Sequence, residues 1–204
     1  MMTVHGDPLI EFDKVGLSRE GRVIVDDVSL RLDAGEILVI LGESGLGKTT
    51  VLHAAAGLLE PSSGTVTRRC ERQGMLFQEA RLLPWMSVGR NVRLAAPGRS
   101  AWSPGPHPEV DRALDEVGLR DVADLPPFRL SGGMQRRAAL ARALFARPSV
   151  VFADEPFAHL DSASAKTVGV ALGRAAAEGT GVLMTAHEIT DVFTTMGIYR
   201  TLFL

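Results

Sequence analysis

Three short, almost uninterrupted apolar runs stand out from the mixed pattern of the rest of the chain. They are Ile37–Leu41, Val150–Ala153 and Val182–Thr185. A strand without alternation is buried on both faces, as in a parallel sheet covered by helices on each side. In Val28–Leu32, by contrast, apolar and polar side chains alternate with period two, so the strand Val23–Leu32 has one face in water. The pattern therefore predicts a buried parallel sheet and a second, more exposed β region.

Helical stretches separate the buried strands and carry start and stop signals at their ends. The predicted helices are 48–56, ending at Gly57, then 134–147, ending before Pro148, and 161–178, which Asp161 caps. Strands that alternate with helices imply a largely parallel sheet. Shorter strands are predicted at 9–12, 65–67 and 74–77, and a last helix precedes a terminal strand at 200–204.

The chain between Gln78 and Leu130 differs from its surroundings. Arg81–Ala96 is predicted to be helical in its second half, with Ser87 as a possible N-cap, and Glu109–Val117 is predicted to be a short amphipathic helix. Between them, Pro97–Pro108 is rich in Pro, Gly and Ser and is predicted to be a surface loop. We therefore expect a single domain of 204 residues, with a core formed by 1–78 and 134–204 and a helical subdomain formed by 79–133.

Overall composition narrows the possible classes of protein. Hydrophobic residues make up 46% of the chain, which is typical of a globular protein, and a net charge of −2 gives no indication of a nucleic-acid partner. Cys70 is the only cysteine, so no intrachain disulfide can form and a reducing cytosol is expected. No run approaches 18 apolar residues, so we expect no membrane-spanning segment.

The first buried strand runs directly into a glycine-rich loop and a helix. The sequence from Gly42 to Thr49 matches G-x-x-x-x-G-K-[ST] in the strand–loop–helix context that a phosphate-binding loop needs. Glycines let backbone N–H groups approach a polyphosphate, Lys48 can reach the β- and γ-phosphates, and the Thr49 hydroxyl can bind Mg²⁺. The alternative is a glycine-rich turn without a ligand. The residues predicted to surround the nucleotide here are Gly42, Glu43, Ser44, Gly45, Leu46, Gly47, Lys48, Thr49 and Thr50.

Polar side chains follow the other two buried strands. Asp154 and Glu155 end the strand Val150–Ala153, and His187 lies just beyond Val182–Thr185. Ligands of open α/β sheets bind at the carboxyl ends of the strands, so these side chains are candidates for metal binding and for activating a water molecule. A lone histidine is more often an ordinary surface or core residue, so His187 alone is weak support for this interpretation.

Several further motifs occur in a fixed order and carry a resemblance to a known family. They are the phosphate loop, Gln78 in MLFQEARLLPW, LSGGMQRR at Leu130–Arg137, VVFADEP at Val150–Pro156, AHLD at Ala158–Asp161 and TAHE at Thr185–Glu188. From about Leu9 to Leu204, the chain resembles the ATP-binding subunit of ABC transporters. FQEARLLPW, LSGGM and DEPF look most like the importer branch, which serves nitrate, sulfonate, taurine or thiamine-precursor uptake.

This resemblance implies an α/β fold of the P-loop NTPase type: a mainly parallel sheet, an N-terminal antiparallel β subdomain and a small α-helical insert. It implies that ATP and Mg²⁺ are the ligands. The implied catalytic residues are Lys48, Gln78, Glu155 as general base, and His187; the implied metal-binding residues are Thr49, Gln78 and Asp154. The residues implied to act across a dimer are Ser131, Gly132 and Gly133, which grip the nucleotide of a second subunit, and the D-loop acid Asp161.

The same resemblance implies the surroundings of the protein. The expected partners are a second copy of the ATPase subunit and transmembrane permease subunits, with a solute-binding protein acting indirectly and no nucleic acid. The expected location is the cytoplasmic side of the cell membrane, as a peripheral subunit. The apolar group Leu82–Met86 either docks on the permease or packs inside the insert, and partial burial is expected for Trp85 and Trp102.

Two positions depart from the family pattern. Met134 replaces the common Gln after LSGG, and Arg19 stands where an aromatic residue usually stacks on adenine, ten residues before Ser29. Either the Arg19 guanidinium covers the base, or the loop at Leu17–Arg22 is shifted and another residue, or none, covers it. Other activities remain open from sequence: an exporter-type ATPase, a non-transport ABC ATPase, or a catalytically silent nucleotide-binding module.

Overall fold

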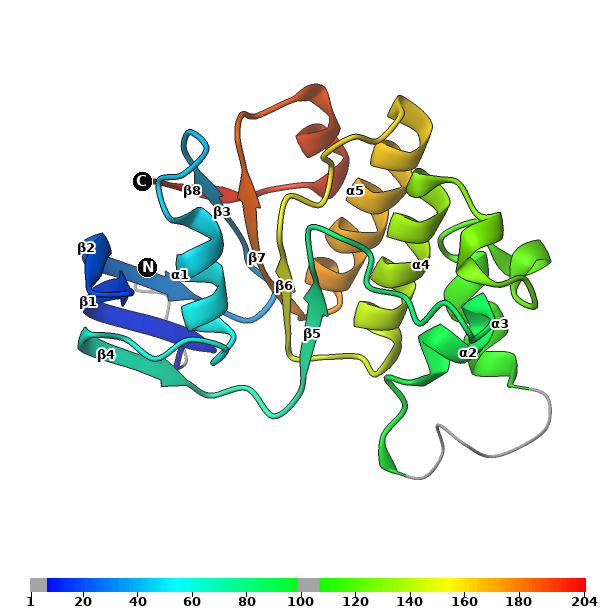
Figure 1. Cartoon of the computed structure of the whole chain (residues 1–204), viewed down its shortest axis with the longest axis horizontal. Helices are drawn as coiled ribbons and strands as arrows, with labels where there is room; N and C mark the ends of the chain where they lie inside the picture. Colours follow the sequence, from blue (N-terminus) through cyan, green and yellow to red (C-terminus); the bar gives the residue numbers. More distant parts are fainter. Residues whose placement is uncertain (1–6, 99–106) are drawn as a thin grey trace, which may run out of the picture.

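A computed structural model describes residues 7–98 and 107–204. The chain forms two sheets with helices between and beside them (Figure 1). The smaller sheet is antiparallel, with strand order β2-β1-β4. Its strands are β1 (Ile10–Arg19), β2 (Arg22–Leu32) and β4 (Ser63–Arg68).

The larger sheet is parallel, with strand order β5-β6-β7-β3-β8. Its strands are β3 (Ile37–Leu41), β5 (Gln73–Leu76), β6 (Val150–Ala153), β7 (Gly181–Ala186) and β8 (Arg200–Phe203). Strand β3 pairs with β7 on one side and with β8 on the other, so both neighbours of β3 come from the last quarter of the chain. The carboxyl ends of these strands lie at one edge, toward the top of Figure 1.

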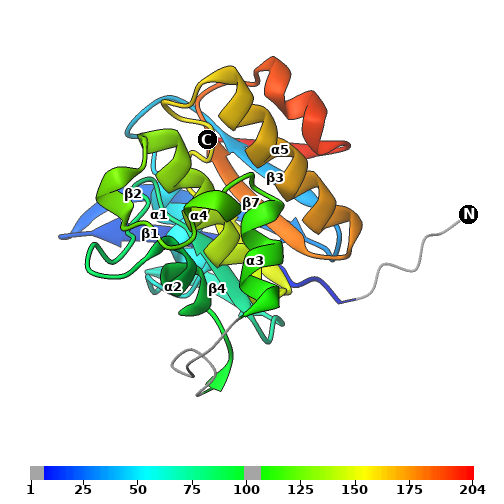
Figure 2. The same ribbon diagram turned by 90° about the vertical axis from the view of Figure 1, so that its right-hand side faces the viewer.

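Helices cover both faces of the parallel sheet. Helix α1 lies between the two sheets, whereas α4 and α5 cover the opposite face and α2 and α3 lie farther out (Figure 1). Figure 2 views the molecule from this outer side, with α2, α3 and α4 in front of the sheet. The helices are α1 (Lys48–Ala55), α2 (Val88–Arg93), α3 (Pro108–Asp115), α4 (Gly132–Phe145) and α5 (Ser162–Ala177), with 3₁₀ helices at Arg120–Val122, Pro127–Arg129 and Asp191–Met196.

The side chains of β3 show why its apolar run does not alternate. Ile37, Val39 and Leu41 belong to the apolar cluster shared with α4 and α5, whereas Leu38 and Ile40 belong to the cluster shared with α1 and the antiparallel sheet. All five side chains are at most 4% exposed. Each face of the strand thus removes apolar surface from water, which is the main favourable contribution to folding. The predicted two-faced burial of this strand is confirmed.

The fold class expected from the sequence is confirmed, but the first strand is longer than predicted. The prediction ended at residue 12, whereas β1 continues to Arg19 and turns back through Glu20 and Gly21, which both have positive φ. Register shifts lie between Phe12 and Val15, where Lys14 also has positive φ. Such bulges break the period-two pattern from which strands are recognised, so the second half of the strand was missed.

The last helix and Trp85 also differ from the sequence prediction. The last helix is a 3₁₀ helix at Asp191–Met196, and Trp85, which was expected to be partly buried, is 74% exposed. Trp102 and most of the predicted loop 97–108 lie outside the described residues. The boundaries of the helical subdomain, 79–133, stay a prediction. Within the described ranges, no helix combines the length and the apolar character needed to cross a bilayer.

Candidate functional site

The phosphate loop joins the end of β3 to the start of α1 and is shaped by its glycines. Gly45 and Gly47 have φ of 86° and 94°, in the left-handed region that glycine adopts without strain. A Cβ at Gly47 would lie 2.6 Å from Val25 Cγ2 and 2.8 Å from Ile24 Cγ2. Strand β2 therefore presses directly on the loop, and only a residue without a side chain fits at this contact.

Lys48 is the first residue of α1, and its ammonium group lies across the loop. Its Nζ donates hydrogen bonds to the carbonyl oxygens of Gly42 (2.7 Å) and Glu43 (2.8 Å). The residue is only 5% exposed. A buried lysine and the positive end of the helix dipole thus concentrate positive charge where the loop backbone is open, an arrangement that suits a polyphosphate.

The Asp154 carboxylate at the end of β6 is held by two hydroxyl groups. Thr49 Oγ1 donates to Asp154 Oδ1 (2.9 Å) and Oδ2 (3.1 Å), and Thr185 Oγ1 donates to Oδ1 (2.7 Å). Asp154 is 3% exposed and Thr185 is fully buried. Sequence reasoning missed Thr185 as a contributor to the site, although a hydroxyl within an otherwise apolar buried strand was a usable signal.

The chemistry of this hydroxyl–carboxylate pair fits Mg²⁺. Magnesium prefers oxygen ligands and commonly takes one or two from the protein, with phosphate oxygens and water completing its shell. Thr49 and Asp154 supply two such oxygens beside the phosphate loop. Among residues 7–98 and 107–204, no group of three or more His, Cys, Asp or Glu side chains could hold a metal ion by itself. A site completed by a bound phosphate agrees with both observations.

Glu155, next to Asp154, is contacted by side chains that follow two other parallel strands. Gln78 Nε2 donates to Glu155 Oε2 (3.3 Å), and His187 Nε2 lies 3.0 Å from Glu155 Oε1 and 3.3 Å from Ser44 Oγ. The loops after β5, β6 and β7 and the phosphate loop therefore meet at one point. A carboxylate held in this way can accept a proton from a water molecule, and an imidazole beside it can donate to an anion.

The predicted LSGG residues are not part of this cluster. Ser131 caps α4, its Oγ accepting from the backbone N–H of Met134 (3.3 Å), and Asp161 caps α5 by accepting from Ser164. These hydrogen bonds from Ser164 hold the pKa of Asp161 below its usual value. Helix α4 and helix α1, which the phosphate loop leads into, cover opposite faces of the parallel sheet (Figure 1). The structure therefore separates Ser131 and its glycines from the nucleotide loop of the same chain.

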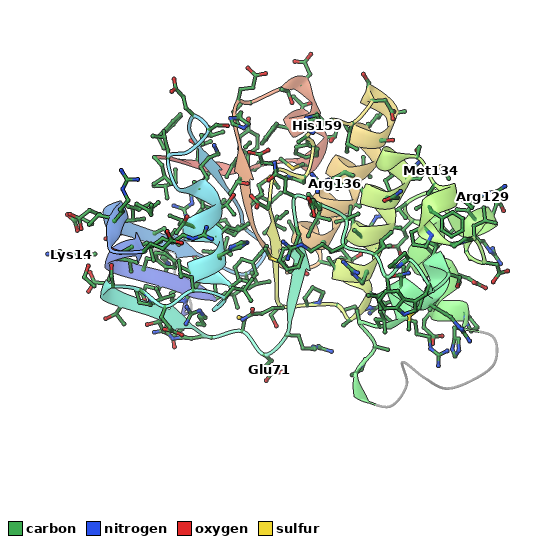
Figure 3. The ribbon with its side chains drawn as sticks, in the orientation of Figure 1. Lys14, Glu71, Arg129, Met134, Arg136 and His159 are labelled. Carbon is green, nitrogen blue, oxygen red and sulfur yellow. The ribbon has the colours of Figure 1, made fainter. Side chains whose placement is uncertain are left out.

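The loop that carries Gln78 is fixed by an arginine that sequence reasoning did not single out. Arg136 of α4 is 5% exposed and lies on the side of the helix that faces the sheet (Figure 3). Its Nη1 donates to the carbonyl oxygens of Phe77 and Gln78. Burial lowers the pKa of Arg136, and the charges of Asp154 and Glu155 oppose this effect. Nothing in the sequence distinguishes this arginine from its neighbour Arg137.

The following segment, Leu82–Met86, is held by Asn91 of α2, which is fully buried. Asn91 Oδ1 accepts from the backbone N–H of Leu83 (2.7 Å), and its Nδ2 donates to the carbonyl oxygens of Leu83, Met86 and Ser87. These bonds fix the backbone while the Trp85 side chain projects outward. Core packing is therefore the wrong interpretation for Trp85, although Leu82 does pack against the core.

Arg19 lies at the tip of the hairpin between β1 and β2. It pairs with Arg22 across the turn and is exposed, and the neighbouring Val23 is 68% exposed. One strand of this hairpin, β2, also carries Ile24 and Val25, which lie against Gly47. A base extending from the phosphate loop could therefore meet Arg19 or Val23, and the geometry alone leaves both alternatives open.

Comparison with known proteins agrees with this geometry. A family model described as "ABC transporter" matches residues 25–158. An aliphatic sulfonates import ATP-binding protein, SsuB 1 of Mesorhizobium japonicum, is 37% identical over 95% of this chain and 75% of its own length. SsuB 2 of Burkholderia cenocepacia is 45% identical over 69% of this chain. The chain spans about half the length of that relative, 53%.

A solved structure extends the likeness to the fold. The ATP-binding cassette MJ0796, described as a dimer in a post-hydrolysis state bound to ADP and Pi, superposes with a TM-score of 0.80. The match covers 96% of this chain and 94% of the cassette, at 26% sequence identity. With a family model over residues 25–158 and a relative matched over 95% of this chain, the chain belongs to the ABC transporter family.

Proposed function

We propose that this protein binds and hydrolyses ATP and that hydrolysis powers a membrane importer for a small solute. The observation that carries this proposal is the meeting of four loops at one edge of the sheet. Lys48 lies across the phosphate loop, Thr49 contacts Asp154, and Glu155 lies against Gln78 and His187. A charge-binding loop, a metal-binding pair and an oriented carboxylate are together the parts that hydrolysis of a nucleoside triphosphate requires.

We assign each residue a role that agrees with its contacts. The loop backbone and Lys48 bind the β- and γ-phosphates, and Thr49 and Asp154 hold Mg²⁺, which when bound neutralises charge on the phosphate oxygens. Glu155 accepts the proton of the attacking water. Gln78 and His187, both within hydrogen-bond distance of Glu155, orient the water and contact the γ-phosphate.

The second half of each nucleotide site comes from a second copy of the chain. Ser131, Gly132 and Gly133 lie at the start of α4, which covers the face of the sheet opposite α1, so a two-fold dimer in which these residues face the partner's nucleotide makes use of both. Asp161 lies next to this surface, since a Cβ at Gly133 would be 3.4 Å from Asp161 Oδ2. The dimer described for the similar cassette MJ0796 supports this arrangement.

The membrane partner is a permease that binds the exposed loop around Trp85, on the cytoplasmic side of the membrane. The loop follows Gln78 directly, so movement at the nucleotide can reach the docking surface over a few residues. The names of the sulfonate-import relatives favour a small sulfonate as cargo, delivered to the permease by a solute-binding protein. No residue of this chain needs to contact that cargo.

Glu155→Gln tests the catalytic assignment. The variant keeps the shape of the side chain but cannot accept the proton, and a positioned general base contributes about 10²–10⁴-fold, equal to about 3–5 kcal/mol. We expect ATP affinity to be retained, turnover to fall by that factor and an ATP-bound dimer to accumulate. Near-native turnover in this variant would exclude Glu155 as the base.

Mixing two inactive variants tests whether the sites are shared. Ser131→Arg blocks the part that faces the partner, and Lys48→Ala disables the phosphate loop. A mixed dimer contains one site in which both halves are intact, so activity should return on mixing. Failure to recover activity in heterodimers purified with two different affinity tags would count against shared sites.

A further inference from the structure

Glu155 has an unusual backbone conformation. Its φ is +45°, in the left-handed region that residues with a side chain rarely adopt. Such conformations persist only when the surrounding structure holds them, and they are often found where a side chain must point in a particular direction. The structure should therefore contain groups that keep Glu155 in place.

Two buried side chains bind the backbone N–H and the backbone carbonyl oxygen of Glu155. The backbone N–H of Glu155 donates to Thr185 Oγ1 (2.9 Å), and its carbonyl oxygen accepts from Arg136 Nη2 (2.7 Å). Thr185 is fully buried and Arg136 is 5% exposed, so water cannot readily replace either bond. Both polar groups of the peptide backbone at Glu155 are thus bound by side chains from other elements, β7 and α4.

We propose that Thr185 and Arg136 act as a clamp that fixes Glu155 in its left-handed conformation and so aims the carboxylate that serves as general base. This inference rests on the proposed function, because it assigns positioning residues to the base named there. Neither residue touches the reacting atoms. Their action is on the backbone, from which the direction of the Glu155 side chain follows.

The clamp also joins the base to the rest of the site. The Thr185 hydroxyl, which accepts from Glu155, donates its own proton to Asp154 (2.7 Å), so one group orients both acids. The second arm of the Arg136 guanidinium binds the carbonyl oxygens of Phe77 and Gln78. Because the guanidinium is a rigid planar fork, a displacement of the Gln78 loop is passed to the backbone of Glu155.

A double-mutant cycle separates this role from a general effect on structure. Thr185→Val is close to isosteric but removes the hydroxyl, and releasing the backbone by about 1 Å can cost about 100-fold in rate. We expect kcat to fall about 10- to 100-fold with little change in KM for ATP. Thr185→Ser, which keeps the hydroxyl, should restore most of the rate.

The same substitution is then made in Glu155→Gln. If Thr185 acts mainly through the base, Thr185→Val should lower the residual rate of that variant several-fold less than it lowers the rate of the unchanged protein, because only the bond to Asp154 still contributes there. Thr180→Val is the matched control, because Thr180 Oγ1 also donates a hydrogen bond (3.0 Å, to Pro148) but lies at the start of β7, away from the site. An equal loss in both backgrounds, or near-native kcat in Thr185→Val, overturns the proposal.

Arg136 is tested by replacing its planar fork with a single charged group. Arg136→Lys keeps the charge but cannot bind three carbonyl oxygens in one plane, so kcat should fall at least 10-fold, and again several-fold less in Glu155→Gln. Arg137→Lys, on the next position of α4, is the control. Normal kcat in Arg136→Lys would contradict the role of Arg136. So would an equal loss of kcat when the substitution is made in Glu155→Gln.

A measurement that does not need activity distinguishes failure of the clamp from failure of the proposed function. Amide hydrogen exchange at Glu155, followed by NMR, reads the bond to Thr185 directly. Exchange should accelerate at least 10-fold in Thr185→Val and stay unchanged in Thr180→Val. Unchanged exchange in Thr185→Val refutes the clamp whether or not the protein hydrolyses ATP. Absent ATP hydrolysis with accelerated exchange refutes the proposed function and leaves the backbone clamp standing.

Discussion

Two loops leave the same edge of the parallel sheet and are held in opposite ways. The loop after β3 is short, glycine-rich and shaped by its own backbone, with one strand pressing on Gly47. The loop after β5 is longer and contains no glycine between Phe77 and Ser87. Its carbonyl oxygens are bound by side chains from other elements: Arg136, Arg142 and Asn91.

The difference reflects what each loop does in the proposed function. A phosphate-binding loop must keep its N–H groups free for the ligand, so glycine shapes its backbone and the Lys48 side chain binds its carbonyl oxygens instead. A loop that transmits movement to a partner must instead be hydrogen-bonded to the elements that move. Hydrogen bonds from Arg136, Arg142 and Asn91 hold the second loop rigidly and make its position depend on helices α2 and α4. Substitutions should therefore damage the two loops by different routes.

The largest effect is expected from Gly47→Ala, in the phosphate loop. An alanine must adopt a left-handed φ, at about 1–2 kcal/mol, and its Cβ must displace Val25 and Ile24, at about 1–3 kcal/mol more. ATP affinity, measured by calorimetry, should fall at least about 30-fold. Gly21→Ala is the control, since Gly21 has φ of 76° but nothing within 4 Å of an added Cβ. An equal loss of ATP affinity in Gly47→Ala and Gly21→Ala would show that the contact between Gly47 and β2 does not matter.

Asn91→Ala should be the next most severe change, and its effect should fall on the other loop. The substitution removes four hydrogen bonds to Leu83, Met86 and Ser87 and leaves the partly buried N–H of Leu83 unpaired, which should lower the free energy of unfolding by about 2–4 kcal/mol. Urea denaturation measures the loss, while ATP affinity should stay close to normal. Arg90→Ala, an exposed neighbour in α2, should change stability by less than about 0.5 kcal/mol. A large loss of ATP affinity in Asn91→Ala would contradict the independence of the two loops.

Arg19→Tyr should have a smaller effect, of opposite sign. An aromatic ring on a base contributes about 1–3 kcal/mol, compared with about 0.5–1 kcal/mol for an exposed cation–π contact. We expect the variant to bind ATP about fivefold more tightly than the unchanged protein does. GTP should compete with ATP less well for the variant than for the unchanged protein. Arg22→Tyr, on the facing position of the hairpin, is the control. Unchanged ATP affinity would show that residue 19 does not face the base.

Trp85→Ala should change the isolated protein least. The side chain is 74% exposed, so the free energy of unfolding should shift by less than about 0.5 kcal/mol and ATP affinity should be unaltered. Co-expressed with its permease, however, the variant should lose membrane association, which cell fractionation can measure. Leu58→Ala, at a residue 59% exposed near the end of α1, is the control. Unimpaired membrane association of Trp85→Ala would exclude this loop as the docking surface.

Much of the fold was predictable because its signals are local. An apolar run without alternation marks a strand buried on both faces, and β3, β6 and β7 all occur where such runs predicted them. The helix caps Ser87 and Asp161 also occupy their predicted places. The bulged half of β1 was not predictable, because its positive φ angles arise from pairing with β2 and β4, which no local pattern encodes.

The residues of the candidate site also divide into those with a local sequence signal and those without one. Residues that would touch ligand stand in short motifs at strand ends, so the meeting of Thr49 with Asp154, and of Glu155 with Gln78 and His187, could be predicted. The groups that support them come from distant elements and carry no motif. Arg136 and Arg137 are adjacent and identical in type, yet only one reaches the Gln78 loop, because the turn of the helix decides which faces the sheet. The roles of the ligand-contacting residues stay predictions until the variants are measured.

The position of β3 in the parallel sheet has a consequence for the order in which the molecule assembles. The strand that leads into the phosphate loop is made early, but its two neighbours, β7 and β8, follow about 140 and 160 residues later. At about 5–20 residues per second, a ribosome needs about 8–32 s to reach β8 after completing β3. During that time the most apolar strand of the sheet lacks both partners, and pairing over such long separations is slow. Newborn chains are therefore expected to expose this strand to chaperones, and to gain the ability to bind a nucleotide only as the final strands emerge.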